Sequence, residues 1–300
     1  MSQSLNEKIS LNDFQFRDGI YFPKDYEQLN HSTQKQRWDK IGKTYYGSQK
    51  VEQATEASPI KQDYTLLTGK PGGTWNKFPD NKSVESILEI GCGYGRIPLY
   101  LSKGKNLRCQ RYYGMDISEP LLRRLLKCKQ EYDFFPDAEF NPICNSAETL
   151  PLEENSIDLV ISNCVFMHIP DAQIRNLMVE MSRVLKPGGI FVFNHSFHNK
   201  FCPAHKIHNF VRSFNPGQNS IYLKQYSATE IKEILIASGM SAKCPRYTVE
   251  PTQEYAILPN KIKGIPVPFA NMINRTIKPS SDSQKETFAY GYSAYSTQLD

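Results

Sequence analysis

The chain has 300 residues, of which 39% are hydrophobic and 22% charged, and its formal net charge is +5, from 36 basic and 31 acidic residues. That composition is typical of one large folded domain with appended segments, and it excludes a disordered chain. The basic excess is too small and too scattered to indicate a nucleic-acid partner. No stretch approaches the roughly 20 apolar residues that span a bilayer, and the N-terminal residues lack the apolar core of a signal peptide. With seven cysteines and no C-x-x-C pair, we expect a cytoplasmic protein with reduced thiols and no membrane partner.

Residues 1–83 are largely irregular. They contain one candidate helix, Lys35–Gly47, in which Trp38, Ile41 and Tyr45 recur at helical spacing. The region ends in TGKPGGTWNKFPDNKS, whose Gly, Pro and Asn residues indicate a loop. We therefore predict an N-terminal cap and linker over residues 1–83, in front of the core.

From residue 84 to about 260, apolar strand segments alternate with amphipathic helices. The predicted strands cover residues 84–90, 111–117, 138–145, 157–166 and 189–197, with a closing pair at 243–250 and 253–260. The predicted helices cover residues 96–103, 118–132, 171–189 and 227–240, and Ser227 with Glu230 forms a capping box. This alternation predicts an α/β fold with a doubly wound, mostly parallel seven-stranded sheet. The polar, tyrosine-containing tail, residues 261–300, is expected to be a lid or a flexible segment.

A glycine-rich turn, GCGYG, follows the first strand of this core with Gly91, Gly93 and Gly95. A doubly wound sheet binds its ligand at the carboxyl ends of its strands, and glycines let a ligand approach the backbone closely. The turn is not a P-loop, because Gly95 is followed by Arg96 and Ile97 instead of leading into Gly-Lys-Ser/Thr. It also departs from the dinucleotide pattern G-x-G-x-x-G, because Arg96 replaces the third glycine.

Two acidic residues beside the turn favour an adenosyl ligand without phosphate. Glu89 precedes the turn by two residues, and its carboxylate would repel a pyrophosphate but attract an ammonium group. S-Adenosylmethionine has such an ammonium group and no phosphate. Asp116 ends the second strand, and its carboxylate can accept hydrogen bonds from the hydroxyls of a ribose.

Four motifs in order make the chain resemble the class I S-adenosylmethionine-dependent methyltransferases over about residues 84–258: LEIGCGYGR, YYGMDIS, NSAETLPLEENSIDLVISNCVFMHIPD and LKPGGIFVF. The resemblance implies a Rossmann-like methyltransferase fold with S-adenosylmethionine as cofactor. It implies that Asp116 holds the ribose, that Glu148 contacts the adenine amino group and that Ala147 backs the ring. The other cofactor-binding residues predicted in these motifs are Glu89, Gly91, Cys92, Gly93, Gly95, Arg96, Ile117, Asn163, Cys164 and Val165. In addition, Tyr46, an aromatic residue of the N-terminal helix, is predicted to cap the sulfonium.

Methyl transfer needs an aligned nucleophile and, for a hydroxyl or a protonated amine, a group that removes the proton. His168 follows the fourth strand, in a segment that lines the active site of related enzymes, and its ordinary pKa of about 6.5 suits a base. His195 ends the fifth strand and is predicted to face the same site. A purely structural role, in which His168 fixes the loop before Pro170, stays open.

A histidine-rich stretch follows the fifth strand. Spacing of three residues can place metal ligands on one face of a helix, and four histidines follow the pattern H-x-x-H-x6-H-x-x-H: His195, His198, His205 and His208. However, Asn199 and Pro203 indicate a loop, and methyl transfer requires no metal. We therefore predict no metal site.

The sequence predicts an S-adenosylmethionine-dependent methyltransferase that methylates a hydroxyl or carboxylate oxygen of a small molecule or natural product. The segment that would carry an N-P-P-Y-type amino-methylating motif reads S-N-C-V over residues 162–165, which disfavours a planar amide or base as acceptor. N-methylation of a metabolite or short peptide stays open, as does a non-catalytic protein of the same fold that binds S-adenosylmethionine.

Overall fold

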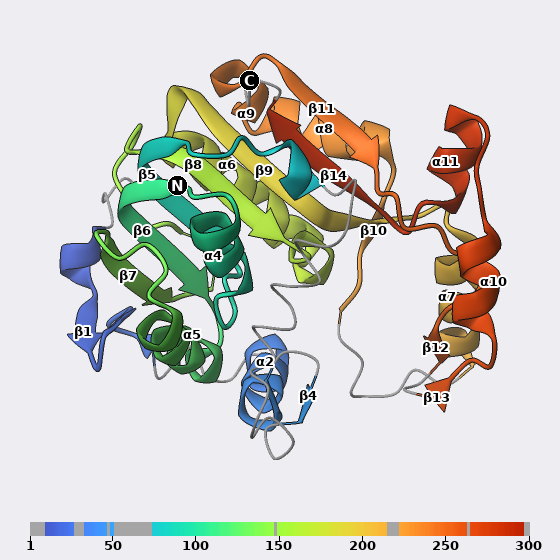
Figure 1. Cartoon of the computed structure of the whole chain (residues 1–300), viewed down its shortest axis with the longest axis horizontal. Helices are drawn as coiled ribbons and strands as arrows, with labels where there is room; N and C mark the ends of the chain where they lie inside the picture. The colour runs from blue at the N-terminus through green and yellow to red at the C-terminus, as the bar shows by residue number, and fades with distance from the viewer. Residues whose placement is uncertain are drawn as a thin grey trace, which may run out of the picture.

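The computed structural model of the chain describes residues 10–26, 33–46, 49–50, 74–146, 149–214, 222–262 and 265–296. Within these residues the central sheet has ten strands (Figure 1). In sheet order the strands are β1 (Gln15–Arg17), β2 (Ile20–Phe22), β7 (Glu139–Cys144), β6 (Arg108–Asp116), β5 (Ser83–Ile90), β8 (Ile157–Asn163), β9 (Leu185–Asn199), β14 (Gly291–Ser296) and β11 (Tyr247–Pro251), and β10 (Gln225–Tyr226) pairs with β9.

The sheet is mostly parallel, and its strand order reverses at β5. Strands β7, β6, β5, β8 and β9 run parallel to one another, whereas β14 is antiparallel to both of its neighbours, β9 and β11. The chain runs from β5 outward to β6 and β7, and then returns to β8 and β9 on the other side of β5. The gap between the carboxyl ends of β5 and β8 is therefore the topological switch point, where ligands bind in doubly wound sheets. The predicted fold class is confirmed.

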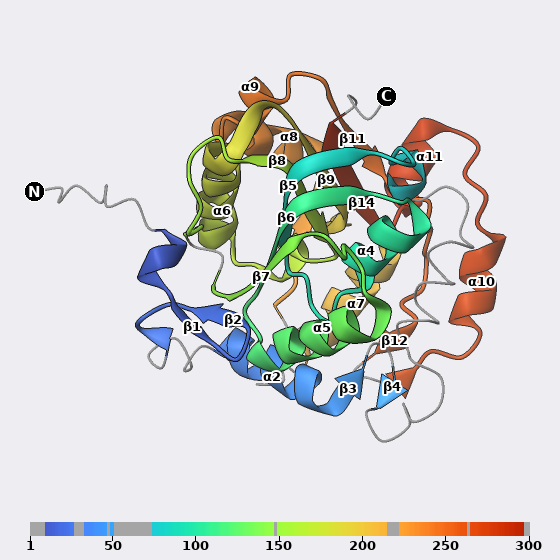
Figure 2. The ribbon, with the colours of Figure 1, turned by 60° about the vertical axis from the view of Figure 1, so that its left-hand side comes forward.

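Helices cover both faces of the sheet (Figure 2). One face carries α4 (Arg96–Leu99), which continues as a π-helical turn over Tyr100–Gly104, and α5 (Glu119–Tyr132). The other face carries α6 (Asp171–Val184), α8 (Ala228–Ala237) and α9 (Met240–Lys243). The N-terminal helix α2 (Thr33–Thr44) packs on the start of α5, where a β-carbon at Gly42 would lie only 3.0 Å from the Pro120 Cβ.

A separate group of elements lies beyond β9 and β14, at the right-hand end of the molecule in Figure 1. It contains α7 (Pro203–Ser213), α10 (Ala270–Thr276), α11 (Asp282–Phe288) and the hairpin β12 (Lys261–Ile262) with β13 (Ile265–Pro266). The short hairpin β3 (Tyr45–Tyr46) with β4 (Gln49–Lys50) follows α2. In the described part of the chain, no helix is both long enough and apolar enough to cross a membrane.

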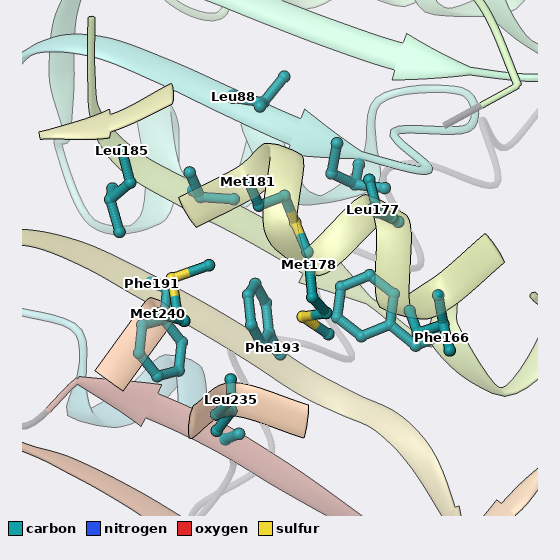
Figure 3. Packing of buried hydrophobic residues seen from close by; sticks show 14 of the residues in the cluster. Leu88, Phe166, Leu177, Met178, Met181, Leu185, Phe191, Phe193, Leu235 and Met240 are labelled. Carbon is teal, nitrogen blue, oxygen red and sulfur yellow. The ribbon is translucent and has the colours of Figure 1, made fainter. Parts of the chain in front are cut away.

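The packing of α6 shows why its sequence forms a helix on this sheet. Five apolar residues recur at spacings of three and four and are fully buried: Ile174, Leu177, Met178, Met181 and Val184. Val179, on the outer side of the helix, is exposed. In Figure 3, Leu177 and Met181 lie against Leu88 of β5, while Phe193 of β9 lies between α6 and Leu235 of α8. The buried stripe of α6 therefore sets the helix across the strands that carry the switch point.

The tail contributes a strand to the sheet, which corrects the expectation of a lid or flexible segment for residues 291–296. The closing strand pair is β11 with β14, and residues 253–260 form only an isolated bridge from Tyr255 to Ala289. The polar sequence GYSAYS does not show the apolar pattern of a buried strand, because its serines are buried through hydrogen bonds within the sheet. Ser293 Oγ accepts a hydrogen bond from His195 N–H, and Ser296 Oγ accepts one from Phe191 N–H, both at 2.9 Å. All six residues of β14 are buried.

Three smaller predictions were also wrong. The sheet extends beyond seven strands because β1, β2 and β10 join it, and Ile20 and Phe22 of β2 are fully buried at its edge. The helix predicted to reach residue 189 ends at Val184, and residues 185–189 already belong to β9. The segment read as a loop because of Pro203 is helix α7, which begins at that proline, and proline is favoured at the first helical position.

Candidate functional site

The glycine turn lies at the switch point, and its three glycines have different surroundings. Gly91, Gly93 and Gly95 have φ angles of 69°, 54° and 98°, in the left-handed region that favours glycine. A β-carbon at Gly91 would lie 2.4 Å from Val165 Cγ2, and one at Gly95 would lie 2.7 Å from Leu125 Cδ1. A β-carbon at Gly93 would meet no atom within 4 Å. Gly91 and Gly95 are therefore needed for packing, whereas Gly93 faces open space at the carboxyl end of β5.

Asp116 closes the turn from the end of β6. Its Oδ2 accepts a hydrogen bond from the Gly93 N–H, and its Oδ1 accepts one from the Ser118 N–H, both at 2.9 Å. Burial raises the pKa of Asp116 to about 6, although both backbone N–H groups oppose this rise. A carboxylate has about four acceptor positions, so this group keeps capacity for the hydroxyls of a ribose. The pairing of an acceptor with the open glycine fits an adenosyl group.

Glu89 lies beneath the turn instead of projecting from it. It is 1% exposed, and its Oε2 accepts a hydrogen bond of 2.5 Å from the Tyr112 hydroxyl. Burial raises the pKa of Glu89 to about 8, while the Tyr112 hydrogen bond and the charge of Arg96 partly oppose this. In this structure the carboxyl group of Glu89 is thus largely protonated near pH 7. The sequence analysis relied on the negative charge of this group, and that charge would form only beside a cation, which favours the ionised carboxylate.

The other predicted residues of the turn and of the neighbouring loops differ in their placement. The Cys92 side chain is 4% exposed and packs in the core near Gly114, so any contact of Cys92 with a ligand comes from its backbone. The Ile117 carbonyl accepts from the Cys144 thiol at 3.7 Å, just after β6. Ala147 and Glu148 lie outside the described residues. Tyr46 pairs with Gln49 through its backbone, and its side chain is likewise outside the described part.

Asn163 connects the end of β8 to two other elements. Its Oδ1 accepts hydrogen bonds from Trp75 Nε1 at 3.1 Å and from Asn194 Nδ2 at 2.7 Å. Cys164 follows with an exposed side chain and a φ of 60°, and Val165 then packs on Gly91. The roles of Trp75 and Asn194 were missed from the sequence. The available signal was an asparagine at the end of β8, Asn163, which is in register with an asparagine within the adjacent parallel strand β9, Asn194.

His168 lies in a short 3-10 helix, η5 (Phe166–His168), with its ring against the N-terminal helix. Its Nδ1 is 3.2 Å from the Tyr222 carbonyl oxygen, and the Trp38 ring lies edge-on with a centroid distance of 5.2 Å. A carbonyl oxygen can only accept, so Nδ1 carries the proton and Nε2 keeps its lone pair. Burial lowers the pKa of His168, which keeps the ring neutral near pH 7.

The inner side of α2 brings further polar groups to this region. Gln34 Nε2 donates to the His168 carbonyl at 3.4 Å, and Asp39 Oδ2 accepts from Lys35 Nζ at 2.7 Å. The amide oxygen of Gln34, Oε1, and the second carboxylate oxygen of Asp39, Oδ1, are both buried without a partner among the described residues. The charge of Asp39 also raises the pKa of Asp116, so the two carboxylates share one region. No motif pointed to α2 for these acceptors.

His195 has different surroundings from His168. It has a φ of 46°, its ring lies near Tyr290 at a centroid distance of 5.8 Å, and its Nδ1 is 3.8 Å from Glu254 Oε2. It is therefore oriented toward β14 and the segment before it, whereas His168 contacts α2. The structure does not bring the two predicted catalytic histidines into one contact group.

Two further histidines form a buried stack next to His195. The rings of His198 and His205 stack at 4.4 Å, and His205 Nε2 is 2.8 Å from the Tyr290 carbonyl oxygen. Burial lowers the pKa of His198 to about 2 and that of His205 to about 4, and the neighbouring histidines add to this effect. Across the described ranges, no group of three His, Cys, Asp or Glu residues is arranged to hold a metal ion.

Comparison with known proteins agrees with this geometry. A family model described as a methyltransferase domain matches residues 88–193, from β5 to β9. The tRNA N(3)-cytidine methyltransferase METTL2 of Mus musculus is 27% identical over 139 residues, which are 46% of this chain and 36% of the relative. Phosphoethanolamine N-methyltransferase of Triticum aestivum is 31% identical over 41% of this chain and 23% of the relative. The phthiotriol/phenolphthiotriol dimycocerosates methyltransferase of Mycobacterium leprae is 30% identical over 57% of this chain and 56% of the relative.

A solved structure extends the likeness to most of the chain, for the fold alone. A chain from the complex of the Haloferax volcanii Trm112 methyltransferase activator with a methyltransferase aligns with a TM-score of 0.50 and 16% identity, covering 86% of this chain and 95% of that one. The curated relatives are longer than the matched part, since this chain spans about a third of the length of the METTL2 proteins that it matches.

Proposed function

Residues 88–193 make this chain a member of the class I S-adenosylmethionine-dependent methyltransferases, and we propose that it transfers the methyl group of S-adenosylmethionine to an oxygen of a small molecule. The observation that carries the proposal is the pairing of Asp116 with the open Gly93 at the switch point of the sheet. We further propose a cytoplasmic location, in keeping with the free thiols of all seven cysteines.

The residues around the turn would hold the cofactor in named roles. Asp116 would accept the ribose hydroxyls, and Gly93 would let the ligand lie against the backbone. Glu89 would become ionised as the amino-acid ammonium approached the turn above it, because a nearby cation favours the charged carboxylate. When bound, the cofactor supplies a methyl group activated by a sulfonium, so the protein need only align the acceptor and manage its proton.

His168 is our candidate for the base. Its Nδ1 proton is held by the Tyr222 carbonyl, so the Nε2 lone pair is free to take the proton of an acceptor hydroxyl as the oxygen–methyl bond forms. The ring would then lose that proton to solvent or buffer. His195 is the second candidate, with Glu254 available to stabilise its protonated form.

N-methylation is the second candidate reaction. The buried oxygens Gln34 Oε1 and Asp39 Oδ1 lack donors among the described residues, and an acceptor amine could supply N–H groups to them. The names of two relatives, the tRNA N(3)-cytidine and the phosphoethanolamine methyltransferases, specify nitrogen as their acceptor atom. Isotope-labelled S-adenosylmethionine, incubated with the protein and metabolite fractions, would identify the acceptor atom by mass spectrometry of the labelled product.

Calorimetric titration with S-adenosylmethionine and with S-adenosylhomocysteine tests the cofactor role. Asp116→Ala should weaken the binding of both by about 1–3 kcal/mol, the scale of a hydrogen bond to a charged group. Asp137→Ala, at an exposed position, is the matched control and should bind like the unaltered protein. Absence of binding to either ligand would refute the cofactor assignment, and an unchanged affinity in Asp116→Ala would refute the ribose role.

A further inference from the structure

One side of helix α2 lies against the start of α5. Gly42 packs on Pro120, and the Gly42 carbonyl accepts a hydrogen bond of 2.6 Å from Arg124 Nε. Lys35 and Asp39 precede Gly42 at spacings that place all three residues on the same side of a helix. The side of α2 that carries Lys35 and Asp39 therefore faces the start of α5.

Contacts of Lys35 fix the Asp39 carboxylate at this position. Lys35 is buried, and its ammonium nitrogen lies 5.0 Å from the centre of the Tyr26 ring and 2.7 Å from Asp39 Oδ2. The Tyr26 hydroxyl donates to Glu119 Oε2 at 2.9 Å, in the first turn of α5. Asp39 is therefore held close to the junction between the end of β6 and the start of α5, with one of its oxygens paired.

Two buried polar atoms near this junction lack hydrogen-bond partners among the described residues. They are Asp39 Oδ1 and the hydroxyl oxygen of Ser118, the fully buried residue just before α5. The charge of Asp39 raises the pKa of Asp116, so Asp39 Oδ1 belongs to the region of the carboxylate assigned above to the ribose. Because buried polar atoms are nearly always paired, an unpaired carboxylate oxygen beside a candidate ligand site points to a donor on the ligand.

The ribose is the part of S-adenosylmethionine that best matches this acceptor. A ribose offers two neighbouring hydroxyl donors, and Asp116 already accepts one backbone N–H on each of its oxygens. The ammonium group is a poorer match, because the carboxyl group assigned to it, Glu89, lies beneath the glycine turn after β5. An acceptor on α2 next to Asp116 would therefore complete the hydrogen bonding of the sugar.

We propose that Asp39 is a further cofactor-binding residue, whose Oδ1 accepts a hydrogen bond from a ribose hydroxyl together with Asp116. This inference rests on the proposed methyltransferase function and adds an acceptor from α2 to the cofactor site. Lys35 is the positioning residue, because it holds Oδ2 and leaves Oδ1 for the ligand. The proposal assigns Asp39 Oδ1 to the cofactor and leaves Gln34 Oε1, whose side chain contacts His168, for an acceptor molecule.

Calorimetric titration of Asp39→Ala with three ligands tests the proposal. S-Adenosylmethionine, S-adenosylhomocysteine and methylthioadenosine share the ribose, but only the first carries a sulfonium and only the first two carry an ammonium group. Asp39→Ala should weaken the binding of all three by a similar factor of roughly tenfold to a hundredfold, the range for a hydrogen bond to a charged group. Gln36→Ala, at an exposed position of α2, is the matched control and should bind like the unaltered protein.

Analogues of S-adenosylhomocysteine that lack the 2′- or the 3′-hydroxyl test the ribose contact itself. Each analogue is compared with S-adenosylhomocysteine in the unaltered protein and in Asp39→Ala. For one of the two analogues, the loss of affinity should be smaller in Asp39→Ala by roughly tenfold, because the variant no longer bonds to the missing hydroxyl.

A second variant separates ligand binding from folding. Asp39→Ala leaves the buried ammonium group of Lys35 without its carboxylate, and such a loss is destabilising. Lys35→Met/Asp39→Leu removes both charges together, so it should fold, as circular dichroism would show, and should bind the three ligands as weakly as Asp39→Ala.

The outcomes distinguish this inference from the cofactor assignment. The inference is overturned if a folded variant keeps its affinity for all three ligands, or if the loss is absent with methylthioadenosine, which would assign Asp39 to the sulfonium or the ammonium group. It is also overturned if only the KM of an amine acceptor rises. Absence of binding to the unaltered protein would refute the cofactor assignment itself, whereas weakened binding in Asp116→Ala but not in Asp39→Ala would refute the role of Asp39 alone.

Discussion

Burial sets the protonation of the groups at the candidate site. The pKa of Asp116 rises to about 6 and that of Glu89 to about 8, because burial penalises the charged form of a carboxyl group. The same cause lowers the pKa of His168, since the charged form of histidine is the protonated one. Burial therefore makes each of these groups easier to neutralise than an exposed one, and a nearby cationic ligand would favour the ionised form of both carboxyl groups.

His168→Asn should lower the turnover number by about 100-fold to 10,000-fold, the usual contribution of a general base, while the affinity for S-adenosylmethionine stays unchanged. The pKa of His168 lies below the ordinary histidine value, so the unaltered enzyme should keep its rate into mildly acidic solution and lose it as the ring becomes protonated. Turnover measured against pH, with titration calorimetry of the cofactor, checks both statements. His208→Asn serves as control, and a rate unaffected by His168→Asn would remove this residue as base.

At the scale of elements, the glycines of the turn between β5 and α4 have two roles: Gly91 is required for packing, and Gly93 faces the candidate cofactor site. Gly91 is pressed against Val165 of the loop after β8, so the two strands at the switch point are locked to each other through their following loops. Gly93 has no neighbour on its open side, but its N–H is held by Asp116 of the next strand. Two glycines in one turn therefore serve different purposes.

Gly91→Ala should destabilise the protein by about 2 kcal/mol or more, because its new β-carbon would lie 2.4 Å from Val165 Cγ2. Gly93→Ala should cost only about 1 kcal/mol of backbone strain, since its φ is positive but its side is open. Cofactor affinity, by contrast, should fall in Gly93→Ala. Denaturant unfolding and calorimetric titration of both variants measure the two effects, and equal losses of stability would contradict this division.

The stacked histidines link β9 to α7 and should make the protein sensitive to acid. The pKa values of His198 and His205 in the folded protein, about 2 and about 4, lie below the value of about 6.5 for an unfolded histidine. The unfolded chain thus binds protons first, and stability should be lost as pH falls from about 6.5 toward 4. His198→Phe keeps an aromatic ring and removes Nδ1, which has no hydrogen-bond partner among the described residues, so it should flatten this loss. Melting temperatures at several pH values check it, and the two proteins should differ least near pH 8. A loss of stability as steep in His198→Phe as in the unaltered protein would contradict it.

At the scale of the whole molecule, the last strand completes the sheet. Strand β14 lies between β9 and β11, and Tyr292, Ala294 and Tyr295 of this strand are buried. Residues 291–296 therefore belong to the core, and β9, which carries His195, is supported on both sides.

Deletion of residues 291–300 should abolish cooperative unfolding, because it would expose the edges of β9 and β11 together with their apolar neighbours. Deletion of residues 297–300 alone is the control and should preserve the melting transition. Thermal unfolding followed by circular dichroism distinguishes the two truncations. A sharp transition at an unchanged temperature in the longer deletion would show that β14 is dispensable.

The sequence by itself determined the α/β class, the strands that carry the glycine turn and Asp116, and the cofactor. Those features are local: apolar runs with period two or 3.6, a glycine turn, and an acidic residue at the end of a strand. The capping box of Ser227 and Glu230 was predictable for the same reason, and the structure shows it.

Only the tertiary structure decided what depends on distant partners. Ser293 and Ser296 look like tail residues until strand β9 supplies donors for their hydroxyls. Glu89 looks like an exposed charge until Tyr112 and the sheet bury it, and Asn163 acquires its meaning from Trp75 and Asn194. Burial and long-range hydrogen bonds arise only when segments far apart in the chain meet, so no local pattern could have revealed them.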